Sequence, residues 1–312
     1  MTVMLKCLSH TPLRGLNDPG AAVLAEVDAL LAQARAEVEA FDPELIVIFA
    51  PDHYNGLFYD LMPPFVLATA AESVGDYQTR LGALSVPSAL ALELARFVLD
   101  QDLDLAISHR LQVDHGCTQT LEELTGALDR YPVIPIIINA VAPPFGPYRR
   151  VRALGEAVGR FIATLNKRVL ILGTGGLSHE PPVPLLAGAD PAVADFLIAG
   201  RNPTPEFRAA RQARTIATGK IFGTPECPLT PLNPAWDEAF MQLMIEGRLA
   251  QVDAFVIDDI SRQAGRSTHE VRTWVAAFAA LAALGPYTAR QDYYRPINEW
   301  IAGYGALSAQ PR

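Results

Sequence analysis

Cysteine is scarce in this sequence. Its 312 residues include three cysteines, Cys7, Cys117 and Cys227, an odd number at scattered spacings. This pattern offers neither a disulfide framework nor the ligand spacing of a structural zinc site, and it suits a reducing compartment. We therefore expect a cytoplasmic protein whose fold is not held by cross-links.

Positive charge is also in short supply. Lysine and arginine number 25 against 34 aspartates and glutamates, which leaves a net charge of −9. An acidic chain of this kind lacks the electrostatic footprint that nucleic acids and anionic membranes need, so neither is an expected partner. A small anionic substrate is still allowed, because it requires only one or two local cations.

Long apolar runs are missing as well. No segment approaches the ~18 uninterrupted apolar residues of a membrane-spanning helix, and the apolar stretch at the N-terminus is too short for a signal peptide. The longest apolar stretch, residues 274–284, is better interpreted as a helix of the core. Neither a repeat nor a low-complexity linker divides the chain, so we expect a single domain over residues 1–312.

Apolar, β-branched runs alternate with longer helical patterns along the first half of the chain. The expected strands and helices are, in order, 3–8, 21–41 (helix), 44–50, 87–100 (helix), 103–108, 119–130 (helix), 133–141, 148–165 (helix) and 168–173. This alternation predicts an α/β fold with a mostly parallel central sheet flanked by helices on both faces. Beyond about residue 190 the chain is expected to be mainly helical, with a long helix from Ser267 and a tail at 293–309 without a clear period.

The histidines are concentrated after the expected strands. His10, His53 and His179 each follow a strand end, and His115 lies beyond a fourth strand in the loop QVDHG. Ligands of open α/β sheets bind in the crevice outside the carboxyl ends of the strands. We therefore expect these four imidazoles to converge on one site.

Four converging imidazoles suggest a metal ion, but histidine alone does not choose among Zn, Fe, Cu and Ni. Two histidines and one carboxylate would form the facial triad of non-haem Fe(II) oxygenases, which leaves three coordination positions open. By spacing, the carboxylate could be that of Asp52, Asp114, Glu180 or Glu270. The other two histidines, His109 and His269, are interpreted as surface or hydrogen-bonded structural residues.

Several long, contiguous segments resemble a known family. They are CLSHTPL, ELIVIFAPDHYNGLFYDLMPPF, LQVDHG, LNKRVLILGTGGLSHEPPVP, STHEVRTWVAAFAAL and YYRPINEWIAGYGALSA. Together they are similar to the class III (LigB-like) extradiol dioxygenases over nearly the whole chain. The resemblance implies a LigB-like three-layer fold, a homo-oligomer, and the use of Fe(II) and O2 to open the ring of a carboxylate-bearing catechol. The expected substrates are 2,3-dihydroxyphenylpropionate and its cinnamate analogue.

Carried over residue by residue, the resemblance implies that His10, His53 and Glu270 are iron ligands and that His115 and His179 are the acid–base pair. We assign His179 as the base that takes a catechol proton and His115 as the proton donor, with the reverse assignment also open. Glu270 rests mostly on the resemblance. Its alternative interpretation is an acid in the first turn of a helix.

Four further residues are candidates for supporting roles. Asp114 would orient the ring of His115, or else be a solvated loop acid. Tyr54, Asn55 and Arg295 are candidates for binding the side-chain carboxylate of the substrate, and a surface salt bridge is the alternative for Arg295.

Two other functions compete with the dioxygenase. A zinc-dependent hydrolase could use the same His/Glu ligands to activate water without O2. A non-catalytic binding protein could keep the fold alone, but it would have no need for both a metal triad and an acid–base pair.

Overall fold

The computed structural model describes residues 2–312 and is built around a central sheet of eight strands. In spatial order these are β10 (Tyr287–Ile297), β11 (Ala302–Pro311), β1 (Thr2–Leu8), β9 (Arg168–Thr174), β2 (Leu45–Ala50), β8 (Val133–Ile138), β3 (Phe65–Ala68) and β6 (Ala106–Ser108). Strands β1, β9, β2 and β8 are parallel to one another. Strands β11 and β3 are antiparallel to their neighbours β1 and β8. The expected parallel centre is present, with antiparallel strands on both sides of it.

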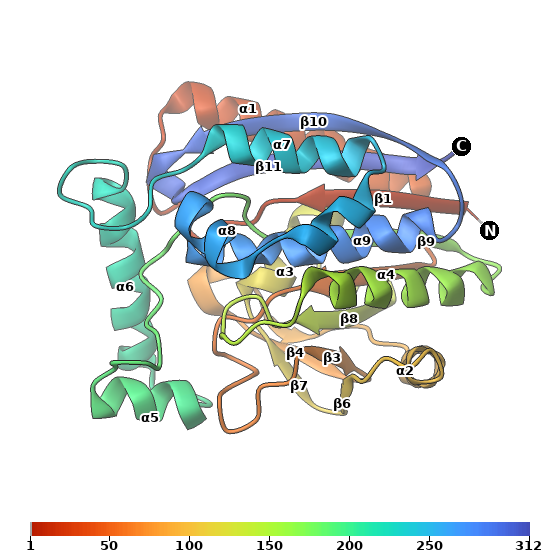
Figure 1. Ribbon diagram of the computed structural model, residues 1–312, viewed down its shortest axis with the longest axis horizontal. Helices are drawn as coiled ribbons and strands as arrows, with labels where there is room; N and C mark the ends of the chain where they lie inside the picture. The colour runs from red at the N-terminus through yellow and green to blue at the C-terminus, as the bar shows by residue number, and fades with distance from the viewer. Residues whose placement is uncertain (1) are drawn as a thin grey trace.

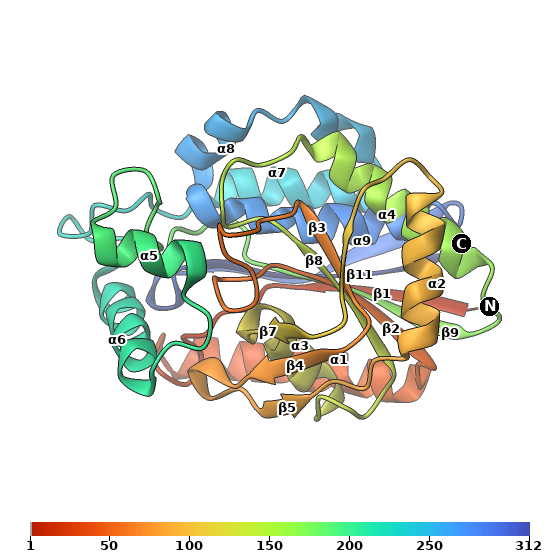
Figure 2. The same ribbon diagram turned by 90° about the horizontal axis from the view of Figure 1, so that it is seen from below.

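Helices cover both faces of this sheet (Figure 2). One face carries α2 (Ser88–Leu99), α4 (Tyr148–Ala163), α7 (Pro234–Ile245) and α9 (Arg272–Ala282). The other face carries α1 (Ala21–Phe41) and α3 (His115–Thr125). Because both faces are covered, β2 and β8 are buried at every residue, which explains their uninterrupted apolar sequence.

Helices α4 and α9 pack unusually close together. A Cβ atom at Gly155 or Gly159 would lie 2.2 or 2.1 Å from the carbonyl oxygen of Ala276 or Ala280, so α4 can carry only glycine at these contacts. Helix α9 is the expected apolar core helix. It begins at Arg272 rather than at Ser267, because a 3-10 segment (Arg266–Val271) precedes it.

A second, three-stranded sheet was not predicted. It consists of β5 (Leu81–Ala83), β4 (Ala71–Val74) and β7 (Leu111–Val113), with β4 parallel to β7. A 3-10 turn (Asp76–Gln78) follows β4, and α3 follows β7. The parallel pairing therefore places Asp76 beside His115, the first residue of α3.

The chain also contains helices α5 (Pro191–Ala199), α6 (Pro205–Ile221) and α8 (Ile257–Ala264) and a 3-10 segment at Leu249–Ala254. Helices α5 and α6 project from one side of the molecule, as Figure 1 shows. Within residues 2–312, none of the helices combines the length and the apolar character needed to cross a membrane.

The expectation of a mainly helical C-terminal part is wrong for the last residues of the chain. After α9, strands β10 and β11 form a long hairpin joined by a 3-10 turn (Asn298–Trp300). Strand β11 is buried along its first eight residues between β10 and β1, so it lacks the apolar–polar alternation of a half-exposed strand. A register shift between Gln291 and Tyr293 further disrupts the alternation in β10.

Candidate active site

Four loops bring the site histidines together at the carboxyl ends of parallel strands. His10 follows β1, His53 follows β2, His179 follows β9, and His115 follows β7. The His53 and His115 rings stack with their centroids 4.5 Å apart, and the His10 ring lies 5.5 and 5.6 Å from them. The four histidines thus lie together, as their positions after strands predicted.

The carboxylate of Glu270 lies at the centre of this cluster. Its Oε1 is 3.0 Å from His53 Nε2 and 3.1 Å from His179 Nε2, and its Oε2 is 3.4 Å from His10 Nε2. The backbone N–H of Gly176 donates to Oε2 at 2.9 Å. Burial acts to raise the pKa of this carboxyl, but the surrounding imidazoles hold it well below its usual range. Glu270 is therefore ionised, and its carboxylate is held in a fixed orientation.

The other three carboxylates that the sequence spacing allowed as metal ligands make different contacts. Asp52 accepts hydrogen bonds from the backbone N–H groups of its own loop, and burial raises its pKa to about 7. Glu180 forms an ion pair with Arg266. Asp114 caps α3 and contacts the Nδ1 side of His53. Of the four candidates, Glu270 is the one that faces the Nε2 atoms of the imidazoles.

The two histidines proposed as ligands contact other side chains through their Nδ1 atoms. His10 Nδ1 lies 2.9 Å from Thr174 Oγ1, and His53 Nδ1 lies 3.3 Å from Asp114 Oδ2. Such outer contacts fix the ring orientation and leave Nε2 for a metal ion. Burial lowers the pKa of His10 to about 3, which keeps that imidazole neutral. Burial opposes a charge on His53 too, but Asp114 and Glu270 raise its pKa well above the usual value.

Asp76, which the sequence did not single out, is the partner of His115. The Asp76 Oδ2 atom is 2.6 Å from His115 Nδ1, and its Oδ1 accepts from the His115 backbone N–H at 2.8 Å. Asp114 was expected to orient His115, but it binds the backbone N–H of His53 at 2.7 Å and the side-chain amide of Asn55 at 2.9 Å instead. The signal for Asp76 was its position after β4, a strand too short to recognise.

The ring of His179 is fixed by its own loop. Its Nδ1 donates to the carbonyl of Leu177 at 2.8 Å, so Nε2, which faces the Glu270 carboxylate, is the atom at which the ring gains or loses its second proton. Asp237 anchors the same loop, since its carboxylate accepts from the backbone N–H of Ser178 at 2.6 Å and from the Ser178 hydroxyl at 2.7 Å. Burial acts to lower the pKa of His179, but Glu270 outweighs it and raises the pKa.

The remaining histidines lie outside the cluster, as expected. His109 Nδ1 is paired with Thr69 Oγ1 at 2.7 Å. His269 is buried between the hydroxyls of Tyr148 and Ser261, at 3.2 and 2.9 Å. Burial lowers the pKa of His269 to about 3, so it is a neutral part of the core.

A cavity that opens to solvent extends from the histidines toward α6, with about 920 Å³ of empty space when its open mouth is included. Its walls combine apolar side chains with the polar face of α6. The lining includes Leu13, Tyr77, Val183, Trp300 and Ile301 on the walls, and Arg208, Arg211, Gln212, Arg214 and Thr215 on the helix. The cavity is therefore bounded by the histidine cluster, by apolar side chains and by the polar face of α6.

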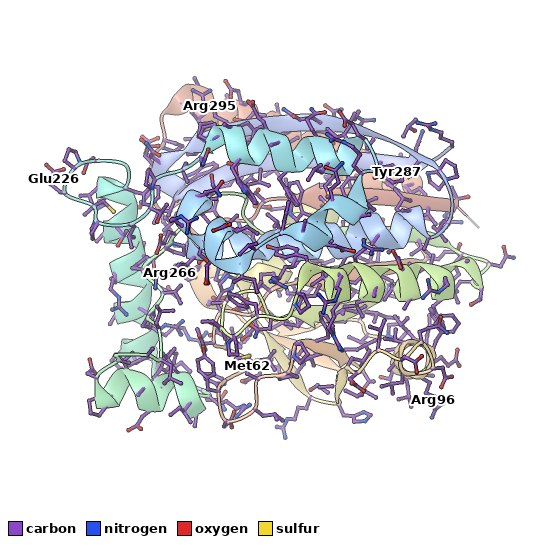
Figure 3. All side chains as sticks on the ribbon, viewed as in Figure 1. Met62, Arg96, Glu226, Arg266, Tyr287 and Arg295 are labelled. Atoms are coloured by element: carbon purple, nitrogen blue, oxygen red, sulfur yellow. The ribbon has the colours of Figure 1, made fainter. Side chains whose placement is uncertain are left out.

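The residues proposed to bind the substrate carboxylate are placed differently from one another. Asn55 lines the cavity. Tyr54 is buried, adopts a left-handed backbone conformation (φ 56°) and directs its hydroxyl to that of Tyr59, 3.4 Å away, so it is not part of the lining. Arg295 lies at the periphery (Figure 3), where it pairs with Glu26 at 2.9 Å. The structure therefore agrees with the surface salt bridge for Arg295 and not with a place in the cavity.

The donor set fits a divalent metal ion. The Nε2 atoms of His10 and His53 lie within 3.4 Å of an ionised carboxylate, and the Nδ1 atoms of both rings contact other side chains. Two histidines and one carboxylate are the residue types of the facial triad. Ligand atoms of His10, His53 and His115 also lie within 4.8 Å of one another, so His115 is within reach of the same ion.

Known proteins share the sequence or the fold of this chain. Residues 4–305 match the family described as the catalytic LigB subunit of aromatic ring-opening dioxygenase. Over the full length of both chains, the sequence is 80% identical to 2,3-dihydroxyphenylpropionate/2,3-dihydroxicinnamic acid 1,2-dioxygenase 1 of Dechloromonas aromatica. It is 78% and 76% identical to 2,3-dihydroxyphenylpropionate/2,3-dihydroxicinnamic acid 1,2-dioxygenases of Azotobacter vinelandii and Xanthobacter autotrophicus, again over both full lengths. The fold is similar to that of an uncharacterized Escherichia coli K12 protein, with a TM-score of 0.52, 13% identity and 99% of each chain covered.

Proposed function

We propose that this chain, which belongs to the LigB family of aromatic ring-opening dioxygenases, cleaves 2,3-dihydroxyphenylpropionate and its cinnamate analogue by extradiol dioxygenation. The observation that carries the proposal is the convergence of the His10, His53 and His179 Nε2 atoms on the Glu270 carboxylate, with His115 beside them. The printed names of the full-length relatives support the choice of substrate. Both atoms of O2 enter the product, and the ring opens between a hydroxylated carbon and the carbon that bears the side chain.

His10, His53 and Glu270 would hold Fe(II). The bound ion would supply a meeting point for the catechol and O2, whose direct reaction is spin-forbidden, and a three-residue set leaves positions open for both. Burial of Glu270 and His10, which are 1% and 5% exposed, limits the access of competing ligands from water. The backbone N–H of Gly176 and the hydroxyl of Thr174 keep Glu270 and His10 in place before substrate arrives.

His179 acts as the base and His115 as the acid. Because His179 donates from Nδ1 to the carbonyl of Leu177, its Nε2 can take a proton from a catechol hydroxyl. His115 is bound through Nδ1 to Asp76, so its Nε2 can deliver a proton to the opening product. The two rings approach the cavity from different loops, which allows each to act on a different oxygen atom.

The proposal is tested by anaerobic reconstitution with Fe(II), addition of 2,3-dihydroxyphenylpropionate and then admission of O2. We expect a yellow ring-opened product and one O2 consumed per substrate, measured by visible absorbance and an oxygen electrode. Protein loaded with Zn(II) serves as the control and should consume no O2. Absence of colour and uptake with iron bound would overturn the proposed substrate, and turnover of the zinc form without O2 would favour a hydrolase.

We also propose that residues 1–312 act as one catalytic domain and that the protein is a cytoplasmic homo-oligomer. The scarcity of cysteine supports a reducing compartment. Light scattering coupled to gel filtration measures the oligomeric state directly, and a monomer at working concentration would contradict it.

A further inference from the structure

The face of α6 that lines the cavity is strongly cationic. Arg208, Arg211, Gln212 and Thr215 follow a three- and four-residue spacing, which places them on one side of a helix, and all four line the cavity together with Arg214. Apart from Gly219, α6 has no buried residue. This helix therefore presents a polar surface toward the site instead of packing an apolar stripe on the body of the protein.

The arginines on this face have no carboxylate partner among residues 2–312. Arg211 donates one N–H bond to the carbonyl of His53 at 3.1 Å, and Arg208 donates a longer one to the carbonyl of Val74 at 3.4 Å. Arg201, by contrast, lies in the preceding loop and pairs with Asp60 at 2.6 Å. The acids that line the cavity, Asp76 and Glu270, are already bound by histidines. Among residues 2–312, the arginines of the cationic face therefore have no anionic partner.

Arg211 is held in a fixed position at the cavity. Its guanidinium lies 4.6 Å above the centroid of the Phe196 ring, and the bond to the carbonyl of His53 ties it to a loop of the proposed metal centre. It is half-buried, so its charge is less hydrated than that of the exposed Arg214. A guanidinium has five N–H donors, and the contact with His53 uses one of them, which leaves an edge able to bind a carboxylate in a bidentate manner.

Helix α6 also contacts the acid–base end of the cavity. Thr215 accepts a hydrogen bond from the hydroxyl of Tyr77 at 3.1 Å, and the Tyr77 ring lies 5.0 Å from the ring of His115. The cationic face and the histidines therefore line one space, which also has apolar walls. A ligand with an aromatic ring at one end and an anion at the other matches this arrangement.

We propose that Arg211 binds the side-chain carboxylate of the substrate and that α6 is the element that selects acidic catechols over neutral ones. This inference rests on the proposed function for the identity of the ring, but not for the charge preference. Arg208 and Arg214 add to the positive potential without making the principal contact. Arg211 is then a specificity-determining residue outside the metal and acid–base groups.

The test is a binding measurement that needs no turnover. Fe(II)-loaded protein is titrated anaerobically by calorimetry with 2,3-dihydroxyphenylpropionate and with 3-propylcatechol, which has the same shape but lacks the carboxylate. In the wild type we expect the acid to bind more tightly. The Arg211→Gln variant should bind the acid roughly 10- to 100-fold more weakly, the loss typical of a charge-assisted contact, and should bind 3-propylcatechol unchanged. Arg211→Lys, which keeps the charge without the planar fork, should fall in between.

Arg201→Gln is the matched control, since Arg201 also stacks on a phenylalanine, at 5.2 Å from the centroid of the Phe58 ring, but does not line the cavity. Equal affinity of the wild type for the acid and for 3-propylcatechol would overturn the inference. So would an equal loss for both ligands in Arg211→Gln and Arg211→Lys, or a selective loss only in Arg208→Gln or Arg214→Gln. Failure of ring cleavage with the charge preference intact would instead overturn the proposed reaction.

Discussion

The two ends of the cavity are built in opposite ways. At the histidine end, the charged groups are bound by other protein groups: Glu270 by imidazoles and the Gly176 N–H, and Asp76 by His115. At the α6 end, Arg208 and Arg211 donate hydrogen bonds only to backbone carbonyls among residues 2–312, and Gly219 is the one buried residue of their helix. A site with its hydrogen bonds already made is preorganised for chemistry. A site with unused donors is arranged for recognition.

The largest effect is expected from Glu270→Gln, which tests whether the histidine end is a metal centre. Removing the charge takes away the one carboxylate that faces the Nε2 atoms, so metal affinity should fall by more than the roughly 10- to 100-fold seen for outer-shell changes. Ring cleavage should fall with it. Metal content is measured by atomic absorption after dialysis, with Glu180→Gln as a neighbouring control. Normal iron content in Glu270→Gln would mean that another group completes the ligand set.

The next effect separates the acid–base pair from the ligands. His115→Gln and His179→Gln should each retain iron and lose roughly 10²- to 10⁴-fold in turnover, the range for removal of a general acid or base. Single-turnover absorbance measurements, with iron content determined on the same samples, report both quantities. Since His115 lies within reach of the ion, loss of iron from His115→Gln would move it to the ligand group.

A smaller effect distinguishes the two aspartates behind the histidines. Asp76→Asn should lower turnover roughly 10- to 100-fold with iron retained, because it loosens the ring of His115. Asp114→Asn should instead weaken iron binding over a similar range, because Asp114 holds the backbone and ring of His53. Iron titrations beside turnover measurements compare the pair. Identical profiles for the two variants would contradict the assignment of separate partners.

The last effect is on stability and not on metal binding or turnover, and it concerns a buried carboxylate outside the metal centre, that of Glu123. Glu123 has one oxygen without a hydrogen-bond partner among residues 2–312, and burial raises its pKa from 4.5 to about 7. The folded state therefore holds this proton more tightly than the unfolded state does. The associated stability is complete below pH 4.5 and is lost as the pH rises through about 7.

We accordingly expect the wild type to lose up to about 3 kcal/mol of unfolding free energy between pH 4.5 and pH 8, relative to Glu123→Gln. Urea unfolding at both pH values measures the difference. Glu39→Gln, which removes a surface acid, controls for the change in net charge. Parallel pH profiles of Glu123→Gln and the wild type would contradict this expectation, because they would show that Glu123 has the same pKa in the folded and unfolded states.

The sequence predicted the parts of the molecule that have long, simple patterns. Strands β2 and β9 are uninterrupted apolar runs, so the positions of His53 and His179 at their ends followed directly. Asp76 was missed because β4 and β7 have only four and three residues, and neither shows a pattern that sequence alone can separate from a loop.

The α6 arginines left no recognisable signal for a different reason. Arg208, Arg211 and Arg214 read as the solvated face of an exposed helix, and their lack of acidic partners is visible only once the helix is placed against the cavity. Arg295 is the opposite case. Its position in a motif of the family made it a candidate, but the structure places it at the surface, where it pairs with Glu26 on α1. Charge recognition depends on contacts between distant segments, which local patterns do not encode.

Strands β11 and β1 pair with each other although they are far apart in the sequence, so they are synthesised at different times on the ribosome. His10 and its strand are synthesised long before β11 and the wall formed by Trp300 and Ile301. Until β11 has been synthesised, β1 can pair with β9 on one side only, and its other edge is open to unwanted association. A premature stop after Glu270 would yield a polypeptide that has every proposed ligand and still lacks the cavity wall formed by Trp300 and Ile301. The site can therefore be completed only after the β10–β11 hairpin has been synthesised.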